Sequence, residues 1–321
     1  MNEKNSVKIS SVLGRFSIII VAVVLFVLLS ILSPHFLGVT NIMNLWLQSI
    51  FVMITAFGMM FVLTIAGIDL SVGAVMGFCG AMCGMAIANG APTVVGIILG
   101  VVLGFAIGIV NGLFITKLNM APFLVTFAMS SIIRGCVELM TTNGAVSGFA
   151  GDSIVNLSQG YVGVVPIGVI ITMAIFVVIV IIIKLTKVGR ILQAIGYNKK
   201  ATGLSGIPVK RYTLVVYGVS GLLAAFSGIM LAARLSSVPS TMGNGYEMDA
   251  IAACVIGGVS MSGGKAKIVG VLFGTIVLQM ISNGLDLLSI NQFYRQVIEG
   301  IIIIFAVAVE GMSERRQRTA A

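Results

Sequence analysis

Few residues in this sequence could do chemistry, and most of them lie within or beside long apolar stretches. Asp69 lies between two such stretches, and Arg134 and Glu138 are one helical turn apart within another. Glu299 lies near the start of the last apolar run, and His35 is the single histidine. Acidic residues at membrane depth usually face the interior of a helix bundle or a wet cavity. Because Arg134 and Glu138 can neutralise each other, we expect a structural ion pair between them. The acids do not form an ordered proton relay.

The motifs of enzymes and metal sites are absent or incomplete. Neither Gly-x-Ser-x-Gly nor His-Glu-x-x-His occurs. The nearest approach to a phosphate-binding loop, at 259–266, has Val259 in place of its first glycine and Ala266 in place of its hydroxyl residue. The sequence therefore predicts no enzyme activity, no cofactor and no metal site. Energy for uphill transport would have to come from another protein or from an ion gradient.

The elements that must position these residues are membrane-spanning helices. Of the 321 residues, 58% are hydrophobic and 9% are charged, whereas a soluble domain has about 25% charged residues. This composition excludes a soluble or disordered protein, and the long unbroken apolar runs exclude a β-barrel. Apolar runs that could cross a bilayer occur at 16–33, 44–66, 71–88, 93–115, 122–140, 164–183, 212–233, 250–262, 268–283 and 296–310. The eighth of these, 250–262, is short and interrupted by glycine. We expect an all-α polytopic membrane protein with about ten transmembrane helices, with eight or nine as alternatives.

The basic residues orient these spans. With a cytoplasmic N-terminus and ten spans, sixteen of the nineteen basic residues fall in cytoplasmic segments. They are Lys4, Lys8, Arg15, Lys117, Lys184, Lys187, Arg190, Lys199, Lys200, Lys210, Arg211, Lys265, Lys267, Arg315, Arg316 and Arg318. This positive-inside pattern explains the net charge of +9 as topology and not as a nucleic-acid-binding surface. We expect a cytoplasmic N-terminal segment at 1–15, one transmembrane domain at 16–310 and a cytoplasmic tail at 311–321.

Glycines recur every fourth residue through one expected span and form a flat stripe on one helix face. The stripe consists of Gly96, Gly100, Gly104, Gly108 and Gly112. Small residues at this spacing let a second helix backbone approach closely, which is how helices pack in membranes. We interpret the stripe as a packing surface.

The chain also resembles itself weakly, and the matching segments would enter the membrane from opposite sides. Residues 67–74 align with 245–252, and 111–113 align with 283–285 at nearly the same offset. This arrangement is typical of the inverted repeats of transporters. Chance similarity in a sequence rich in Gly and Ala is the alternative.

Four polar residues precede or begin expected spans and allow two interpretations. They are Asp69, Ser71, Glu247 and Asp249. Such residues can cap the free N–H groups of a helix, where negative charge also suits the dipole. A place beside a polar pathway is equally consistent with their positions.

The longest cytoplasmic segment, 184–211, contains seven basic residues and no acids. Asn198 can cap a helix of one to two turns, which Gly206 would end before Pro208. A short helix of small residues is a plausible docking surface for a soluble partner. The alternative is a basic loop that faces lipid and has no partner.

Three segments resemble the sugar ABC importer permeases of the ribose permease type. They are Gly-Ile-Asp-Leu-Ser-Val-Gly at 67–73, the Gly-x-Asn-x-x-Ala-x-x-x-Ser-Gly-Ile run at 196–207, and the Gly-Tyr-Glu-Met-Asp-Ala segment at 245–264. Residues 283–285 and the final span fit as well, so the resemblance covers about 15–311. The chain departs at Lys199, where many members have Glu, and at Ala266, which is often Gly.

The resemblance implies the fold of the vitamin B12 importer permeases, with ten helices and an inverted repeat. It also implies a homodimer in the bacterial inner membrane, a cytoplasmic ATPase, and a periplasmic or lipoprotein sugar-binding protein. Membrane lipid would be the only other partner, with no nucleic acid. The resemblance places in the ATPase-coupling segment Gly196, Asn198, Ala201, Ser205 and Gly206, with Lys199 and Lys200 between them.

Two other functions remain possible from the residues alone. A self-sufficient secondary transporter would need a coupling-ion site, for which Asp69 and Glu299 are the candidates. A passive channel would leave the basic cytoplasmic segment unexplained. The expected function is therefore the membrane subunit of an ATP-driven importer for ribose or a related monosaccharide.

Overall fold

A computed structural model describes residues 3–142, 144–149 and 153–291, with positions 294, 297, 298, 300, 301, 304 and 308. The helices are α1 (Glu3–Leu32), α2 (Val39–Thr64), α3 (Val72–Ala88), α4 (Thr93–Lys117), α5 (Pro122–Met140), α6 (Ser153–Gln159), α7 (Ile167–Val180), η1 (Ile181–Leu185, a π-helix), α8 (Lys187–Tyr197), α9 (Lys199–Leu204), α10 (Val209–Leu235), α11 (Tyr246–Ile256) and α12 (Ile268–Leu287). Strands β1 (Tyr161–Val162) and β2 (Val165–Pro166) pair in an antiparallel hairpin. Most of the expected final span, 296–310, and all of the tail, 311–321, lie outside the described residues.

Six helical segments of the described chain are long and apolar enough to cross a membrane. They are α2, α4, α5, α7 together with η1, α10 and α12. The apolar part of α1, Ile18–Leu32, and α3 are shorter. The chain is therefore an all-α polytopic membrane protein. Helix α1 starts at Glu3, before the expected span at 16–33.

Helix α11 is shorter than the span expected at 250–262. It has 11 residues, which gives a length of about 16 Å at about 1.5 Å per residue, roughly half of a ~30 Å hydrocarbon core. The helix stops because Gly258 adopts a φ of +78°. The N–H groups of Gly258 and Val259 then donate to the carbonyls of Val255 and Cys254, which is a Schellman ending.

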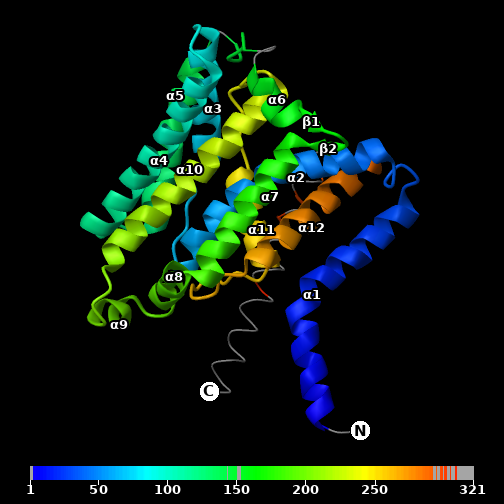
Figure 1. Ribbon diagram of the computed structural model, residues 1–321, viewed down its shortest axis with the longest axis vertical. Coiled ribbons are helices and arrows are strands. Elements are labelled where there is room, and N and C mark those ends of the chain that lie inside the picture. The colour runs from blue at the N-terminus through cyan, green and yellow to red at the C-terminus, as the bar shows by residue number, and fades with distance from the viewer. Residues whose placement is uncertain are drawn as a thin grey trace.

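Helix α2 lies at the centre of the bundle and packs against α7, α10, α11 and α12 (Figure 1). Its side chains are apolar on all sides, so it needs neighbours all round. Phe51, Phe57 and Met60 are each at most 2% exposed. Helix α1 packs on α12 and otherwise extends away from the bundle (Figure 1).

Candidate functional site

The basic segment 184–211 folds into two short helices beyond the ends of α7 and α10 (Figure 1). The side chain of Asn198 caps α9 by accepting a hydrogen bond from the backbone N–H of Ala201 at 2.9 Å. Helix α9 has six residues, and Gly206 follows it with a φ of +83° before Pro208. The predicted short helix with an Asn198 cap is confirmed.

The structure divides the seven expected coupling residues into two groups. Six of them are exposed on or beside α9, namely Asn198, Lys199, Lys200, Ala201, Ser205 and Gly206. Leu204, which sequence reasoning did not select, is 91% exposed at the end of α9. The sequence shows that Leu204 follows small and polar residues, but only the structure shows that its side chain is exposed. Gly196 lies apart from this group, at the end of α8.

Gly196 forms a joint between three segments that are distant in sequence. A Cβ at this position would overlap the carbonyl oxygen of Thr64, which ends α2, and the backbone nitrogen of Gly264. The same Gly264 N–H donates to the Thr64 oxygen at 2.9 Å. Gly263, with a φ of +87°, packs against Gly196 and Ala66. The end of α8 is therefore in backbone contact with the end of α2 and with the loop between α11 and α12.

A hollow of about 650 Å³ lies between α9 and the start of α10. Its basic lining residues are Lys199, Lys200, Lys210 and Arg211. Desolvation lowers the pKa of the Lys199 ammonium from its ordinary value, although the residue as a whole is exposed. Leu204 and Ile207 add apolar surface to the same hollow. The hollow therefore combines basic side chains with apolar surface.

Asp69 is fully buried and serves as the acceptor of a hydrogen-bond network. Its Oδ1 accepts from the backbone N–H of Ser71 at 3.0 Å and from the Ser71 hydroxyl at 2.6 Å. Its Oδ2 accepts from the Ser220 hydroxyl of α10 at 2.9 Å. The Ser71 side chain makes no capping hydrogen bond to α3. Asp69 therefore ties the break between α2 and α3 to α10.

Asn111 extends this network into α4. Its side-chain nitrogen donates to the Ser71 hydroxyl at 2.9 Å, and its Oδ1 is buried without a partner. The corresponding Asn283 of the expected repeat forms a reciprocal amide pair with Asn41 of α2, at 2.8 and 3.0 Å. The internal repeat in the sequence aligned Asn111 with Asn283, but it did not predict which residues their side chains contact.

The two segments matched by the expected repeat, 67–74 and 245–252, meet inside the bundle. A Cβ on Gly73, in the first turn of α3, would overlap Glu247 of α11 and the carbonyl oxygen of Gly243. Oε2 of Glu247 is buried and has no hydrogen-bond partner. Gly245 is the N-cap residue of α11, and Glu247 and Asp249 lie in its first turn. The close approach of two helix starts is possible because Gly73 has no side chain.

Arg134 of α5 points to this junction. Its guanidinium donates to the carbonyl oxygen of Met242 at 2.9 Å. A Cβ on Gly73 would meet both the Glu247 carboxylate and the Arg134 guanidinium, so Glu247 also lies near this guanidinium. The sequence favoured a pair between Arg134 and Glu138 because they are one turn apart. The structure differs because the loop before α11 brings a backbone carbonyl and a second carboxylate to the same side chain.

The glycine stripe of α4 lies against α3 and α10. Gly96 and Gly100 face backbone carbonyls of α3. Gly104 and Gly108 face the carbonyl oxygens of Gly221 and Tyr217 in α10, and Gly112 faces Leu214 of α10. At Gly104 and Gly108, a Cβ would overlap the opposite backbone. The stripe thus allows two helices to lie in backbone contact.

We expect Gly108→Ala to lower the free energy of unfolding by about 1–3 kcal/mol, because the added methyl overlaps the Tyr217 carbonyl and must push α10 away. Thermal unfolding of the purified protein in detergent measures this. Gly203→Ala on α9 is the control, because the nearest atom to its added Cβ, in Val209, is 4.0 Å away. Equal midpoints for both variants would contradict the packing role.

Comparisons with known proteins agree on one class of protein, the permease components of transport systems. Residues 41–307 match the family described as branched-chain amino acid transport system, permease component. The chain is 41% identical to the ribose import permease protein of Bacillus subtilis, over 94% of this chain and 92% of that one. It is 32% identical to the D-allose transport system permease protein of Escherichia coli, over 92% and 90%. It is 34% identical to the L-arabinose ABC transporter permease protein of Azospirillum brasilense, over 95% and 90%. No solved structure matches the chain.

Proposed function

The chain belongs to the family of branched-chain amino acid transport system permease components, and on this premise we propose that it is the membrane subunit of an ATP-driven monosaccharide importer. The observation that carries the substrate class is the similarity, over more than nine-tenths of the chain, to permeases named for ribose, allose and arabinose. As a permease component the chain is a transport protein and not an enzyme. Ribose or a related sugar is the proposed cargo.

The proposed partner on the cytoplasmic side is an ABC ATPase that docks on α9. Its six exposed expected coupling residues, with Leu204, form a small surface that projects beyond the bundle (Figure 1). The adjoining hollow between α9 and α10 has four basic residues and would complement acidic residues of a partner. A periplasmic or lipoprotein sugar-binding protein is the proposed partner on the other side.

We propose that movement of α9 reaches the membrane through Gly196. The backbone contacts of Gly196 with Thr64 and Gly264 join α8 to α2 and to the loop that precedes α12. Because packed interfaces transmit displacement with little compression, a shift of α8 would displace the central helix α2.

Contacts between loops support the proposed orientation, with both termini in the cytoplasm of a bacterium and the chain in its inner membrane. Gly196 and Gly264 belong to segments whose basic residues indicate the cytoplasmic side, and Thr64 lies near the end of the expected span 44–66 that should reach that side. These three residues meet in one joint. On the opposite side, Val146 pairs with Val238 through two backbone hydrogen bonds. Segments assigned to one side of the membrane thus contact each other.

The helix contacts also support the proposed ten-helix fold with an inverted repeat. In the repeat α2 would correspond to α10, α3 to α11, and α4 to α12. The contact between α3 and α10 then corresponds to the contact between α11 and α2. The contact between α4 and α10 likewise corresponds to the contact between α12 and α2. The pairs α3–α4 and α11–α12 also correspond. Such a correspondence is expected when one half of the chain repeats the other.

We propose that a second copy of the chain, and not lipid alone, covers α5. This helix exposes Ser131 and Glu138 along one face, beside Gly135, and the exposed Thr142 follows just after its end. Polar and acidic residues on a membrane helix usually face protein or a water-filled pathway. A homodimer formed over this face would place the polar residues beside a central pathway for the sugar.

The experiment that tests the function is reconstitution of the permease in vesicles, with the ATPase and the binding protein encoded beside it. We expect uptake of labelled ribose, or of another monosaccharide, that requires ATP and both partners. Uptake without any ATPase would instead establish a secondary transporter. In that alternative Asp69 or Glu299 would have to bind an ion. The carboxylate oxygens of Asp69 already accept three hydrogen bonds, and Glu299 lies outside the described residues.

Leu204 is the apolar anchor of the proposed docking surface. We expect Leu204→Ser to weaken the ATPase–permease complex by roughly tenfold or more, because truncating a desolvated anchor costs about 1–2 kcal/mol or more. The dissociation constant of the purified subunits measures this. Leu204→Met is the control and should bind almost as the original chain does. Equal affinity for the serine variant would exclude Leu204 from the contact.

A further inference from the structure

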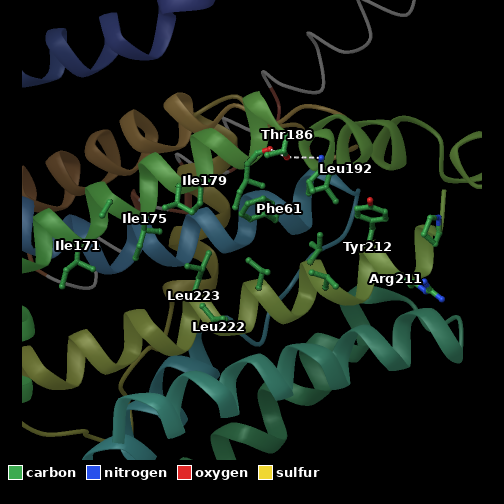
Figure 2. A pocket seen from close by; sticks show the side chains of 18 residues that line it. Phe61, Ile171, Ile175, Ile179, Thr186, Leu192, Arg211, Tyr212, Leu222 and Leu223 are labelled. Carbon is green, nitrogen blue, oxygen red and sulfur yellow. Dashed lines mark hydrogen bonds between the residues drawn. The ribbon is translucent and has the colours of Figure 1, made fainter. Parts of the chain in front are cut away.

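A long apolar groove lies between α7 with η1 on one side and α10 on the other, and Phe61 of α2 contributes to its floor (Figure 2). Its volume is about 910 Å³. Its walls are aliphatic, with Ile171, Ile175 and Ile179 on the α7 side and Leu222 on the α10 side (Figure 2). The groove is therefore suited to a hydrocarbon chain and not to a sugar.

The length of the groove corresponds to one leaflet of a bilayer. It extends along α7 from Ile171 to Ile182 of η1, a distance of about 16 Å at about 1.5 Å per residue. This is roughly half of a ~30 Å hydrocarbon core. Along α10 it extends from Leu223 to Arg211, which lies in the first turn of that helix. The groove thus reaches from mid-membrane to the surface that carries α8 and α9.

Its polar residues gather at that surface. Thr186, Arg211 and Tyr212 line the end of the groove near α8 (Figure 2). The surrounding segment 184–211 has seven basic residues and no acids. Basic pockets between helices on the cytoplasmic side bind anionic lipid head groups, and tyrosine is enriched at the membrane interface.

We propose that this groove binds one anionic phospholipid of the cytoplasmic leaflet, with an acyl chain along α7 and α10 and the phosphate at Arg211. A second copy of the chain is a poorer occupant. A two-fold contact would place the same surface of each copy together, so the two basic groove ends would repel. The choice of leaflet rests on the orientation proposed above, but lipid binding itself requires neither the ATPase nor the sugar.

The test is native mass spectrometry of the purified full-length chain, incubated separately with dioleoyl phosphatidylglycerol and dioleoyl phosphatidylcholine. We expect the original chain to retain phosphatidylglycerol in preference to phosphatidylcholine. Arg211→Gln should reduce that preference by about fivefold, the effect of one basic contact near an anionic surface. Ala174→Trp, which fills the groove from α7, should reduce retention of both lipids. Arg190→Gln, an exposed arginine of α8 outside the groove lining, is the matched control.

Each outcome of this experiment either supports or overturns the proposed lipid site. Loss of preference in Arg211→Gln with retention in Arg190→Gln supports the site. Equal losses in these two variants would show general surface attraction and overturn it. Unchanged retention in Ala174→Trp would also overturn it, as would conversion of this variant from dimer to monomer without loss of lipid. Circular dichroism of each variant verifies that the helices are intact, so a loss reflects the groove and not unfolding.

Discussion

Gly196→Val is expected to abolish sugar-stimulated ATP hydrolysis in the reconstituted transporter while leaving the ATPase itself active. The valine Cβ would overlap both the Thr64 carbonyl oxygen and the Gly264 backbone nitrogen. Neither backbone can move alone, because the Gly264 N–H donates to the Thr64 oxygen. The end of α8 would therefore leave α2. A coupling free energy of about 1.4 kcal/mol corresponds to a tenfold effect on linked equilibria, so we expect at least a tenfold fall in stimulation.

Two neighbouring glycines provide the controls. Gly203→Ala should leave the joint intact and lower stimulation far less than Gly196→Val does, because the nearest atom to its added Cβ, in Val209, is 4.0 Å away. Any loss it causes would reflect the hollow that Gly203 lines. Gly206→Ala should have an intermediate effect, because its Cβ meets nothing but its φ of +83° costs a non-glycine residue about 1–2 kcal/mol. The rate of ATP hydrolysis with and without sugar-loaded binding protein measures all three. Normal stimulation in Gly196→Val would show that the joint does not transmit the signal.

Asp69→Ala is expected to lower the free energy of unfolding by about 3–5 kcal/mol, because it leaves buried donors without their acceptor. The donors are the Ser71 N–H, the Ser71 hydroxyl and the Ser220 hydroxyl. A change of this size corresponds to a fall of roughly 10 °C in Tm. Thermal unfolding in detergent, followed by loss of monodisperse protein, provides the measurement.

Graded variants distinguish hydrogen bonding from other causes. Ser220→Ala removes one of the three bonds and should cost about 1 kcal/mol. Asp69→Asn retains an oxygen that can accept from Ser71 and should lie between the two. A stable Asp69→Ala protein that fails only in transport would contradict the structural role and place Asp69 on the sugar pathway.

Local structure in this chain followed from the sequence where neighbouring residues control it. Asn198, Gly206 and Pro208 predicted the short helix α9, because capping and a positive φ act within a few residues. The apolar runs predicted the long helices, because a bilayer requires about 20 apolar residues in succession. The run at 250–262 was recognised as short and interrupted by glycine, but the end of α11 at Ile256 was not predicted, because the apolar run continues past the glycines that end the helix.

Pairing of polar residues was less predictable. Sequence spacing suggested that Arg134 pairs with Glu138, whereas its hydrogen bond goes to Met242, 108 residues away. Asp69 was recognised as important, but its contact with Ser220 spans 151 residues. Each of these polar groups could pair with several others at a similar free energy, and only the packing of the helices selects the partner.

The sequence by itself determined that this is a helical membrane protein, how its basic segments are distributed, and which residues cap α9. These properties depend on composition and on contacts along one stretch of chain. The tertiary structure alone decided that Gly196 touches Thr64 and Gly264, that Asp69 joins α10, and that α7 and α10 leave an open groove. Such contacts depend on how distant backbones approach one another, and glycine spacing permits that approach without specifying the partner.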